Sequence, residues 1–146
     1  MADVVDSQTR SRMMSNIHSR DTKPELLVRK YLHACGFRFR LNVRSLPGTP
    51  DLVLTKWHTV IFVHGCFWHR HPGCSFAYTP KSRHAFWLEK FEKNVARDAA
   101  AIKALEEAGW RVIVVWECSL RGTQRTSALS ELVQKIREGV INAGEC

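Results

Sequence analysis

The chain has 146 residues, of which 45% are hydrophobic and 25% are charged, so it can bury a core, and its composition excludes a wholly disordered protein. Its formal net charge of +8 favours a polyanionic partner such as nucleic acid. No run of about 18 apolar residues and no secretory signal is present, which predicts a cytoplasmic protein without a membrane segment. Five cysteines, an odd number, favour reduced thiols and a metal over a disulfide framework.

Residues 1–21 are polar and are predicted to form an N-terminal arm that contacts DNA. The spacing of Arg10, Arg12 and Arg20 suits contacts with phosphates. Methionines of the arm, Met14 among them, can press on a base or sugar surface. A solvated terminus is the alternative interpretation. Residues 22–146 are predicted to form a single domain.

The domain is predicted to begin with a helix and a strand. Thr22-Lys-Pro-Glu25 has the form of a capping box, followed by helical spacing up to Gly36, and capping by itself explains Glu25. From residue 37 to residue 44 the period changes to two, with arginines at positions 38, 40 and 44. This pattern predicts a half-buried strand with a basic outer face.

Residues 51–54 and 59–63 are predicted to be neighbouring strands of a hairpin, because only a short connection separates them. Asp51 opens the first of these strands, directly after Pro50. A carboxylate at such a junction can bind a hard cation such as Mg²⁺ together with a backbone carbonyl, while water and substrate phosphate complete the shell. An aspartate that satisfies turn amides is the alternative.

The stretch from His64 to Cys74 concentrates metal-binding and aromatic side chains. Cys66, His71 and Cys74 offer two thiolates and an imidazole, and we expect Cys118, after the apolar run 112–116, to complete a tetrahedral zinc site. Such a closed site is structural. It leaves His64 and His69 available for other chemistry. A Cys- and His-rich tract without a metal is the alternative interpretation. The aromatic pair at positions 67 and 68 is predicted to be a presented wedge, with burial in the core as the alternative.

Residues 82–108 have the longest helical pattern of the chain. The predicted buried stripe consists of Leu88, Phe91, Val95, Ile102 and Leu105. Asp98 falls on this stripe, and an imidazole is its expected partner, with a surface ion pair as the alternative. Trp87 lies off the stripe and is expected to be exposed. A buried strand at 110–116 and an amphipathic helix from residue 126 complete a predicted α/β sheet protein.

Several motifs distributed over nearly the whole chain match one known family. They are Arg10-Ser-Arg-Met13, Thr22-Lys-Pro-Glu25, Pro50-Asp51, His64-Gly-Cys-Phe-Trp-His69, Phe86-Trp-Leu-Glu-Lys90, Asn94 with Asp98, and Trp116-Glu-Cys118. Together they resemble the very short patch repair (Vsr) endonucleases. The resemblance implies a restriction-endonuclease-like α/β fold, with a mixed central sheet flanked by helices and a structural zinc. It also implies magnesium-dependent nicking on the 5′ side of the thymine in T:G mismatches, which arise when 5-methylcytosine deaminates.

The resemblance implies roles for individual residues of the catalytic site. Asp51 would bind Mg²⁺ together with the backbone carbonyl of Val63, and Glu25 would hold metal-bound water. His69 would be the general base, and Asp98 would orient it. His64 would stabilise or protonate at the scissile phosphate.

The resemblance also assigns the metal and DNA contacts. The zinc ligands would be Cys66, His71, Cys74 and Cys118. Phe67, Trp68 and Trp87, with Met14 from the arm, would enter the duplex beside the mismatch. Arg10, Arg12 and Arg20 would contact the DNA backbone.

The expected partner is double-stranded DNA with a T:G mismatch, with a functional link to a cytosine-5 methyltransferase and to mismatch-repair proteins. The protein is expected to act as a monomer at the bacterial nucleoid. Two other functions stay open: a zinc-stapled DNA-binding module without turnover, and a nuclease for matched double-stranded sites. Nicking assays on T:G and T:A duplexes separate the three.

Overall fold

The structure is a computed structural model that describes residues 22–145. The predicted DNA-contacting arm, with Arg10, Arg12, Met14 and Arg20, lies outside the described residues.

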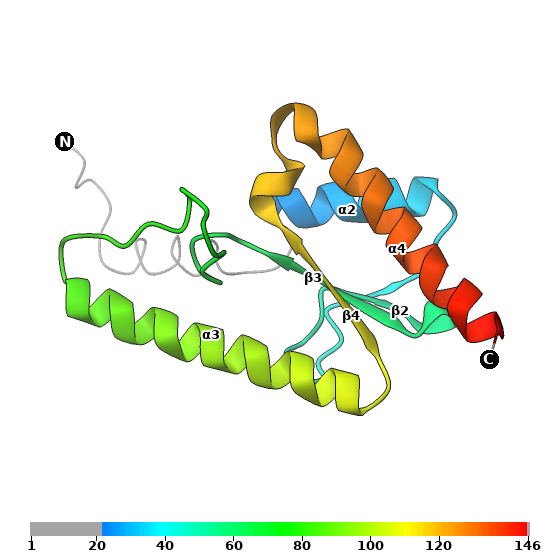
Figure 1. The fold of residues 1–146 in the computed structure, drawn as a ribbon, viewed down its shortest axis with the longest axis horizontal. Coiled ribbons are helices and arrows are strands. Elements are labelled where there is room, and N and C mark those ends of the chain that lie inside the picture. The colour runs from blue at the N-terminus through cyan, green and yellow to red at the C-terminus, as the bar shows by residue number, and fades with distance from the viewer. Residues whose placement is uncertain (1–21, 146) are drawn as a thin grey trace.

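The described chain forms a four-stranded mixed sheet with helices on both faces (Figure 1). Its main elements are α2 (Lys23–Ala34), β1 (Arg40–Leu41), β2 (Leu52–Leu54), β3 (Thr59–His64), α3 (His84–Glu107), β4 (Arg111–Trp116) and α4 (Arg125–Glu145). The strand order is β1-β2-β3-β4, with β3 and β4 parallel and the other two pairs antiparallel. The predicted mixed α/β architecture and the predicted β2–β3 hairpin are confirmed.

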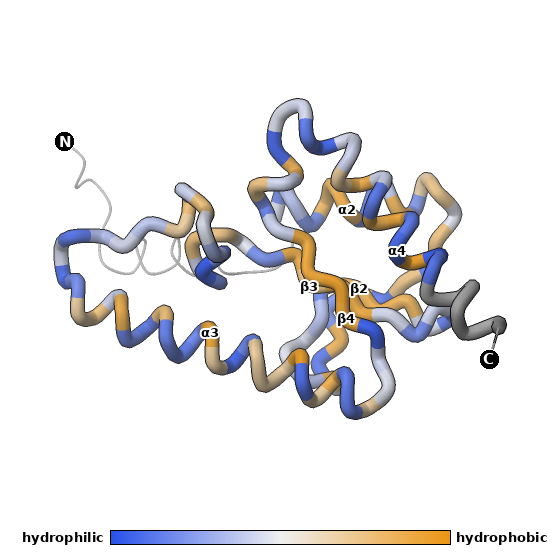
Figure 2. The backbone as a smooth tube through the Cα atoms, viewed as in Figure 1, coloured by the Kyte–Doolittle hydropathy of each residue, from blue (hydrophilic) through white to orange (hydrophobic). Residues whose placement is uncertain are grey.

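The apolar strands are buried on both sides, so alternate residues enter two different cores. Ile61, Val63 and Val115 pack in a core with buried residues of α2 and α4. Val60 and Phe62 face the opposite way and pack with Leu105 of α3. The hydropathy colouring follows this arrangement, since the hydrophobic residues concentrate along the central strands (Figure 2). Burial on both faces explains why these strands read as continuous apolar runs.

The predicted strand over residues 37–44 is wrong for most of its length. Only Arg40 and Leu41 pair with β2, and Leu41 is exposed, while Phe37 is buried in the core. Asn42 has a left-handed φ of 48° and donates its N–H to the Asp51 carbonyl, which ends the extended chain. The reason is that β2 is three residues long and offers no partner for a longer strand.

The predicted stripe of the long helix is also shifted. Leu88 and Val95 are 48% and 44% exposed, whereas Phe91 and Leu105 are buried as expected. As predicted, Ile102 is half-buried against the core under α3. The other buried or half-buried side chains of α3 include Trp87, Phe91, Asn94, Asp98, Ala101 and Leu105. Their steps of four and three residues define one helix face. The predicted stripe already contained Asp98 and shares Phe91 and Leu105 with this face, whereas the polar Asn94 hid the direction of the face from the hydrophobic pattern.

Two other features of the helices follow from local sequence. The capping box is present, because Glu25 N donates to Thr22 Oγ1 and Thr22 N donates to Glu25 Oε2. The turn after α3 is made by Gly109, whose φ of 93° suits only glycine.

Among the described helices none is long and apolar enough to cross a membrane.

Candidate active site and metal centre

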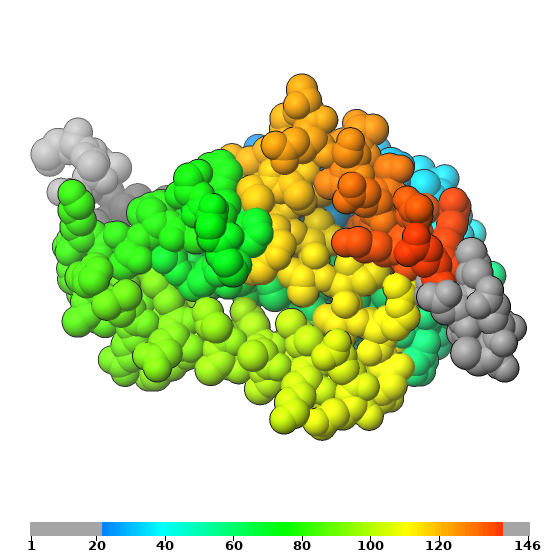
Figure 3. Space-filling model, in the orientation of Figure 1, coloured from blue at the N-terminus to red at the C-terminus, as the bar shows by residue number. Residues whose placement is uncertain are grey.

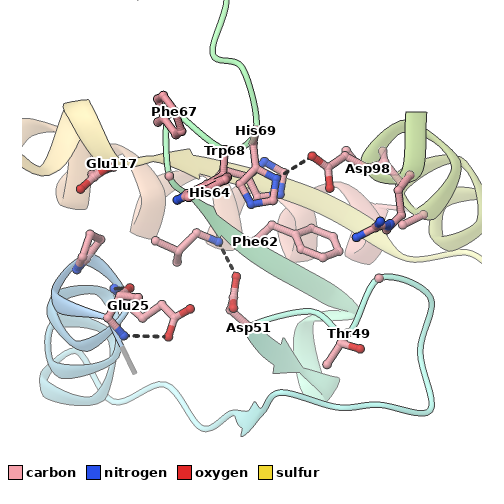
Figure 4. A pocket seen from close by; sticks show the side chains of 18 residues that line it. Glu25, Thr49, Asp51, Phe62, His64, Phe67, Trp68, His69, Asp98 and Glu117 are labelled. Carbon is pink, nitrogen blue, oxygen red and sulfur yellow. Dashed lines mark hydrogen bonds and ion pairs between the residues drawn. The ribbon is translucent and has the colours of Figure 1, made fainter. Parts of the chain in front are cut away.

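The candidate site lies at one edge of the sheet, where three strand ends meet. Parallel β3 and β4 end together, with His64 beside Trp116. Antiparallel β2 begins at the same edge, directly after Asp51. A pocket of about 380 Å³ opens there between the N-terminus of α2, the middle of α3 and the loop that follows β3 (Figure 4).

Asp51 is held at this edge by the backbone of β3. Its Oδ2 accepts a hydrogen bond of 2.7 Å from the N–H of Val63 (Figure 4). Burial, together with the nearby carboxylate of Glu25, raises the pKa of Asp51 from 3.8 to about 7, against the lowering effect of the Val63 N–H. Two neighbouring carboxylates at a pocket form a place where a divalent cation can relieve the repulsion.

Glu25 both caps helix α2 and lines the pocket, two roles that the sequence analysis treated as separate. Its Oε2 caps α2 and lies 3.4 Å from the Arg29 guanidinium, and the residue is buried. The same side chain lines the pocket and faces Asp51 (Figure 4). Capping and proximity to the site therefore coexist.

His69 and Asp98 form a close pair on the other side of the pocket. His69 Nδ1 lies 2.6 Å from Asp98 Oδ2 (Figure 4). The two residues come from the loop after β3 and from the middle of α3, so the fold brings them together across 29 positions of sequence. The imidazole expected as the partner of Asp98 is therefore that of His69, which decides against the alternative of a surface ion pair.

His64, at the end of β3, stacks on His69. The ring centroids are 3.9 Å apart and the planes differ by 5°. Burial, together with the neighbouring His69, lowers the pKa of His64 from 6.5 to about 4, against the raising effect of the Asp98 carboxylate. Its Nδ1 is buried and has no hydrogen-bonding partner among the described residues. A neutral imidazole with an unused polar atom is thus available beside the pocket.

Phe67, Trp68 and Trp87 form an aromatic wedge at the mouth of the site. Phe67 is 4.9 Å from Trp68 and 5.7 Å from Trp87, measured between ring centroids. All three are partly buried, so neither full exposure nor burial in the core describes them. Contrary to the expectation from the stripe, Trp87 is not fully exposed, because it packs on Phe91. In the space-filling view the loop between β3 and α3 lies over the N-terminal half of α3 (Figure 3).

Four predicted ligands converge beside the wedge. The ligand atoms of Cys66, His71, Cys74 and Cys118 all lie within 4.8 Å of one another. His71 Nδ1 is 3.7 Å from Cys66 Sγ and 3.4 Å from Cys118 Sγ. Cys118 comes from the turn after β4, which is adjacent because β3 and β4 are parallel. The cluster is a candidate Cys/His metal site.

The chemistry of the cluster fits a bound cation. Burial raises the pKa of the Cys66 thiol to about 12, although the N–H of Cys118 points at its sulfur and opposes that rise. A buried thiol of this kind becomes a thiolate when a metal binds it. The Cys118 N–H would then stabilise the bound thiolate.

The sequence analysis assigned no role to two further residues of the site, Arg70 and Asn94. Arg70 makes several hydrogen bonds to the loop backbone, and no sequence signal indicated them. Asn94 donates from Nδ2 to the Trp68 carbonyl at 3.2 Å. Its spacing of four residues from Asp98 was a signal that both share one helix face.

A carboxylate at a sheet edge, a His–Asp pair and a basic chain are the groups that metal-assisted hydrolysis of a polyanion needs. The fold and site thus define the class as a hydrolytic enzyme, and comparison with known proteins specifies it.

The family model described as DNA mismatch endonuclease Vsr matches residues 2–75. The DNA mismatch endonuclease Vsr of Escherichia coli strain K12 is 45% identical over 144 residues, which are 99% of this chain and 91% of that protein. Type II nicking enzyme V.NmeAIP of Neisseria meningitidis is 47% identical over 141 residues, 96% of this chain and all of that protein. Type II nicking enzyme V.XorIIP of Xanthomonas oryzae is 48% identical over 120 residues, 82% of this chain and 88% of that protein.

These likenesses show that the chain is a DNA endonuclease. It belongs to the family of the DNA mismatch endonuclease Vsr, as the motifs in its sequence indicated.

Proposed function

We propose that this endonuclease nicks one strand of duplex DNA on the 5′ side of the thymine in a T:G mismatch, and so initiates repair after 5-methylcytosine deaminates. The observation that carries the proposal is the position of the aromatic wedge. Phe67 and Trp68 directly precede His69, whose ring is paired with Asp98 in the pocket. Side chains that can unstack bases and side chains that can cut a strand are therefore neighbours in one loop.

The physics of the mismatch supports this assignment. Inserting apolar wedges between base steps costs a few kcal/mol per step, and the cost is lowest where pairing is already poor. A T:G wobble pair is such a place. Phe67, Trp68 and Trp87, together with Met14 of the arm, are the residues we assign to this insertion. Selectivity then arises from the deformability of the DNA as well as from contacts with base edges.

We assign the catalytic cation to Asp51 and the backbone carbonyl of Val63. In a strand the N–H and the C=O of one residue point to the same side, so the carbonyl of Val63 points toward the Asp51 that its N–H contacts. Magnesium prefers one or two carboxylates, with water and phosphate oxygens as its other ligands. When bound, it would supply neutralisation of the charge that develops at the phosphate.

The side chains around this position have complementary tasks. Asp98 accepts the Nδ1 hydrogen of His69, which leaves Nε2 to accept a proton from the attacking water. His64 is held neutral by burial and can interact with the scissile phosphate. Glu25 is placed to orient water near Asp51.

We assign zinc to the Cys/His cluster. In a tetrahedral site with zinc–sulfur bonds of about 2.3 Å and zinc–nitrogen bonds of about 2.0 Å, neighbouring ligand atoms are about 3.5–3.8 Å apart. The two distances from His71 Nδ1, 3.7 Å and 3.4 Å, fit this geometry. Four protein ligands leave no open position, so the ion would be structural and would stiffen the loop.

The wider proposal covers the fold family and the setting. The mixed sheet with an Asp at its edge is compatible with a restriction-endonuclease-like core over residues 22–146. The basic arm of residues 1–21, with Arg10, Arg12 and Arg20, would contribute the salt-sensitive, sequence-independent part of DNA affinity. A cytosine-5 methyltransferase would generate the base whose deamination creates the substrate.

Nicking assays on matched duplexes test the function. With Mg²⁺, the protein should nick a T:G duplex at the 5′ side of the thymine and leave a T:A duplex of the same sequence intact. His69→Ala should lower the nicking rate by at least about 100-fold while DNA binding persists, because it removes the proposed base. Equal nicking of T:G and T:A would instead support a nuclease for matched sites, and no nicking despite binding would support a binding module.

A further inference from the structure

Arg70 lies in the first half of the loop between β3 and α3 and joins two segments of that loop. Its Nη1 donates to the Phe67 carbonyl at 3.2 Å and to the Tyr78 carbonyl at 2.8 Å. Its Nη2 donates to the Ala77 carbonyl at 2.7 Å and to Thr79 Oγ1 at 3.0 Å. One guanidinium thus satisfies four acceptors, one before it in the chain and three in the later segment 77–79.

The same guanidinium also rests on helix α3. Its Cζ lies 3.8 Å from the ring centroid of Phe91, which is buried and in turn packs against Phe67. Arg70 has a left-handed φ of 55°, which is uncommon for a residue with a side chain. This backbone conformation turns the side chain back over the loop, and the surrounding contacts maintain it.

The two wedge residues of the loop are therefore held by two different side chains. Asn94 of α3 bonds the Trp68 carbonyl, and Arg70 bonds the Phe67 carbonyl. Residues 77–79 form neither helix nor strand, and Arg70 is the partner of the carbonyls at positions 77 and 78. Tyr78 packs its ring 5.1 Å from Phe67, so fixing this segment also fixes the side of the wedge.

We propose that Arg70 is a positioning residue for mismatch recognition. It holds Phe67 and the Tyr78 segment in the conformation that enters the DNA, so that the wedge is already ordered before the protein binds DNA. This inference rests on the proposed function, because it assigns the wedge to DNA insertion. A planar fork is needed, since one ammonium group cannot bond the carbonyls of both segments in the same geometry.

Binding measurements on the full-length protein in magnesium-free buffer test the role. The probes are a T:G duplex and a T:A duplex of the same sequence, each with 2-aminopurine beside the variable pair. Arg70→Met should weaken T:G binding about tenfold, since preorganisation is lost, and T:A binding by less than about twofold. The increase in 2-aminopurine fluorescence on T:G binding should shrink, because the bases are unstacked less.

Arg83→Met is the matched control. Arg83 also stacks on an aromatic ring, with its Cζ 4.3 Å from the Phe86 centroid, and has the same charge. We expect its removal to weaken T:G and T:A binding by the same factor.

Arg70→Lys keeps the charge without the fork and should still lose about threefold or more of T:G affinity. If Arg70→Met fails to fold, the binding measurements are made on Arg70→Lys instead.

Three outcomes would overturn the inference. Equal weakening of T:G and T:A binding by Arg70→Met would reduce Arg70 to a charge contact. Full T:G affinity in Arg70→Lys would show that the fork is not needed. Loss of bound zinc in both variants would assign Arg70 to the metal site. A wild-type protein that does not nick the T:G duplex in the presence of Mg²⁺ would refute the proposed function itself, and is recognised without any variant.

Discussion

At the scale of single residues, the site depends on a carboxylate that the fold makes costly to ionise. Asp51 is anchored by the Val63 N–H, yet burial and the facing Glu25 raise its pKa to about 7. In the absence of a cation the folded protein therefore favours the protonated form of Asp51 below about pH 7. The proposed affinity of the edge for a divalent cation would share one cause with this cost, since both would come from negative charge held in a partly buried pocket.

A pH-dependent stability follows from Asp51. Its pKa is about 7 in the folded protein, against the ordinary value of 3.8 that applies to the unfolded chain, so its stabilising contribution is complete below about pH 4 and is lost as the pH rises through 7. Asp51→Asn should remove this loss, and in magnesium-free buffer it should gain about 2 kcal/mol relative to wild type between pH 5 and pH 8. Urea unfolding at the two pH values measures the difference. If the difference in unfolding free energy between wild type and Asp51→Asn were the same at both pH values, the raised pKa of Asp51 would be contradicted.

At the scale of elements, helix α3 connects the core to the loop. Its C-terminal half packs on the sheet through Leu105. Its N-terminal half carries Phe91 and Asn94, which contact Arg70 and Trp68, and its middle carries Asp98, which contacts His69. One helix face therefore changes from core residues to site residues along its length. The turn before β2 packs on the same helix, because Gly48 lies against Ala101.

Gly48 should be intolerant of any side chain. An added Cβ would lie 2.7 Å from the Cβ of Ala101 and 3.2 Å from Cζ of Phe62, at a φ of +72°. Gly48→Ala should lower the free energy of unfolding by about 2–3 kcal/mol, through backbone strain and the clash with α3. Gly122→Ala is the control, since Gly122 has a φ of +61° and nothing within 4 Å, and should cost about 1 kcal/mol. If chemical denaturation gave the same loss of unfolding free energy for Gly48→Ala and Gly122→Ala, a clash of the added methyl group at position 48 with α3 would be excluded.

At the scale of the whole molecule, the sheet topology assembles both parts of the site. The parallel pairing of β3 and β4 brings residues 64–74 beside residues 116–118, and the antiparallel β2 adds Asp51 at the same edge. The Cys/His cluster joins the loop to the turn after β4. A zinc ion bound there, as proposed, would couple the geometry of the wedge to the stability of the entire sheet.

Cys118→Ala should test this coupling. The variant should lose bound zinc and at least about 3 kcal/mol of stability, because metal binding at such sites contributes directly to folding. Metal analysis and thermal unfolding, with and without a chelator, are the measurements. Cys35→Ala is the control, since Cys35 is exposed and lies outside the cluster. A Cys118→Ala protein with unchanged zinc content would exclude Cys118 as a ligand.

Much of the secondary structure was determined by the sequence itself. The capping box at Thr22, the glycine stops and the apolar runs of β3 and β4 act over a few residues, so local propensity predicted them. The sequence also predicted that four Cys and His side chains would meet, because short spacing confines three of them to one loop, and the structure brings their ligand atoms within 4.8 Å of one another. The strand over residues 37–44 was mispredicted, since pairing depends on a distant partner that the period of two does not reveal.

Only the tertiary structure decided which side chains meet. The facing carboxylates of Glu25 and Asp51 require α2 to dock at the edge of the sheet, and the His69–Asp98 pair requires α3 to cross beneath the loop. The true face of α3 and the contacts of Arg70 depend on that same docking. The physical reason is that local sequence governs backbone conformation, whereas burial, ion pairing and pKa depend on neighbours that become adjacent only when the sheet is assembled.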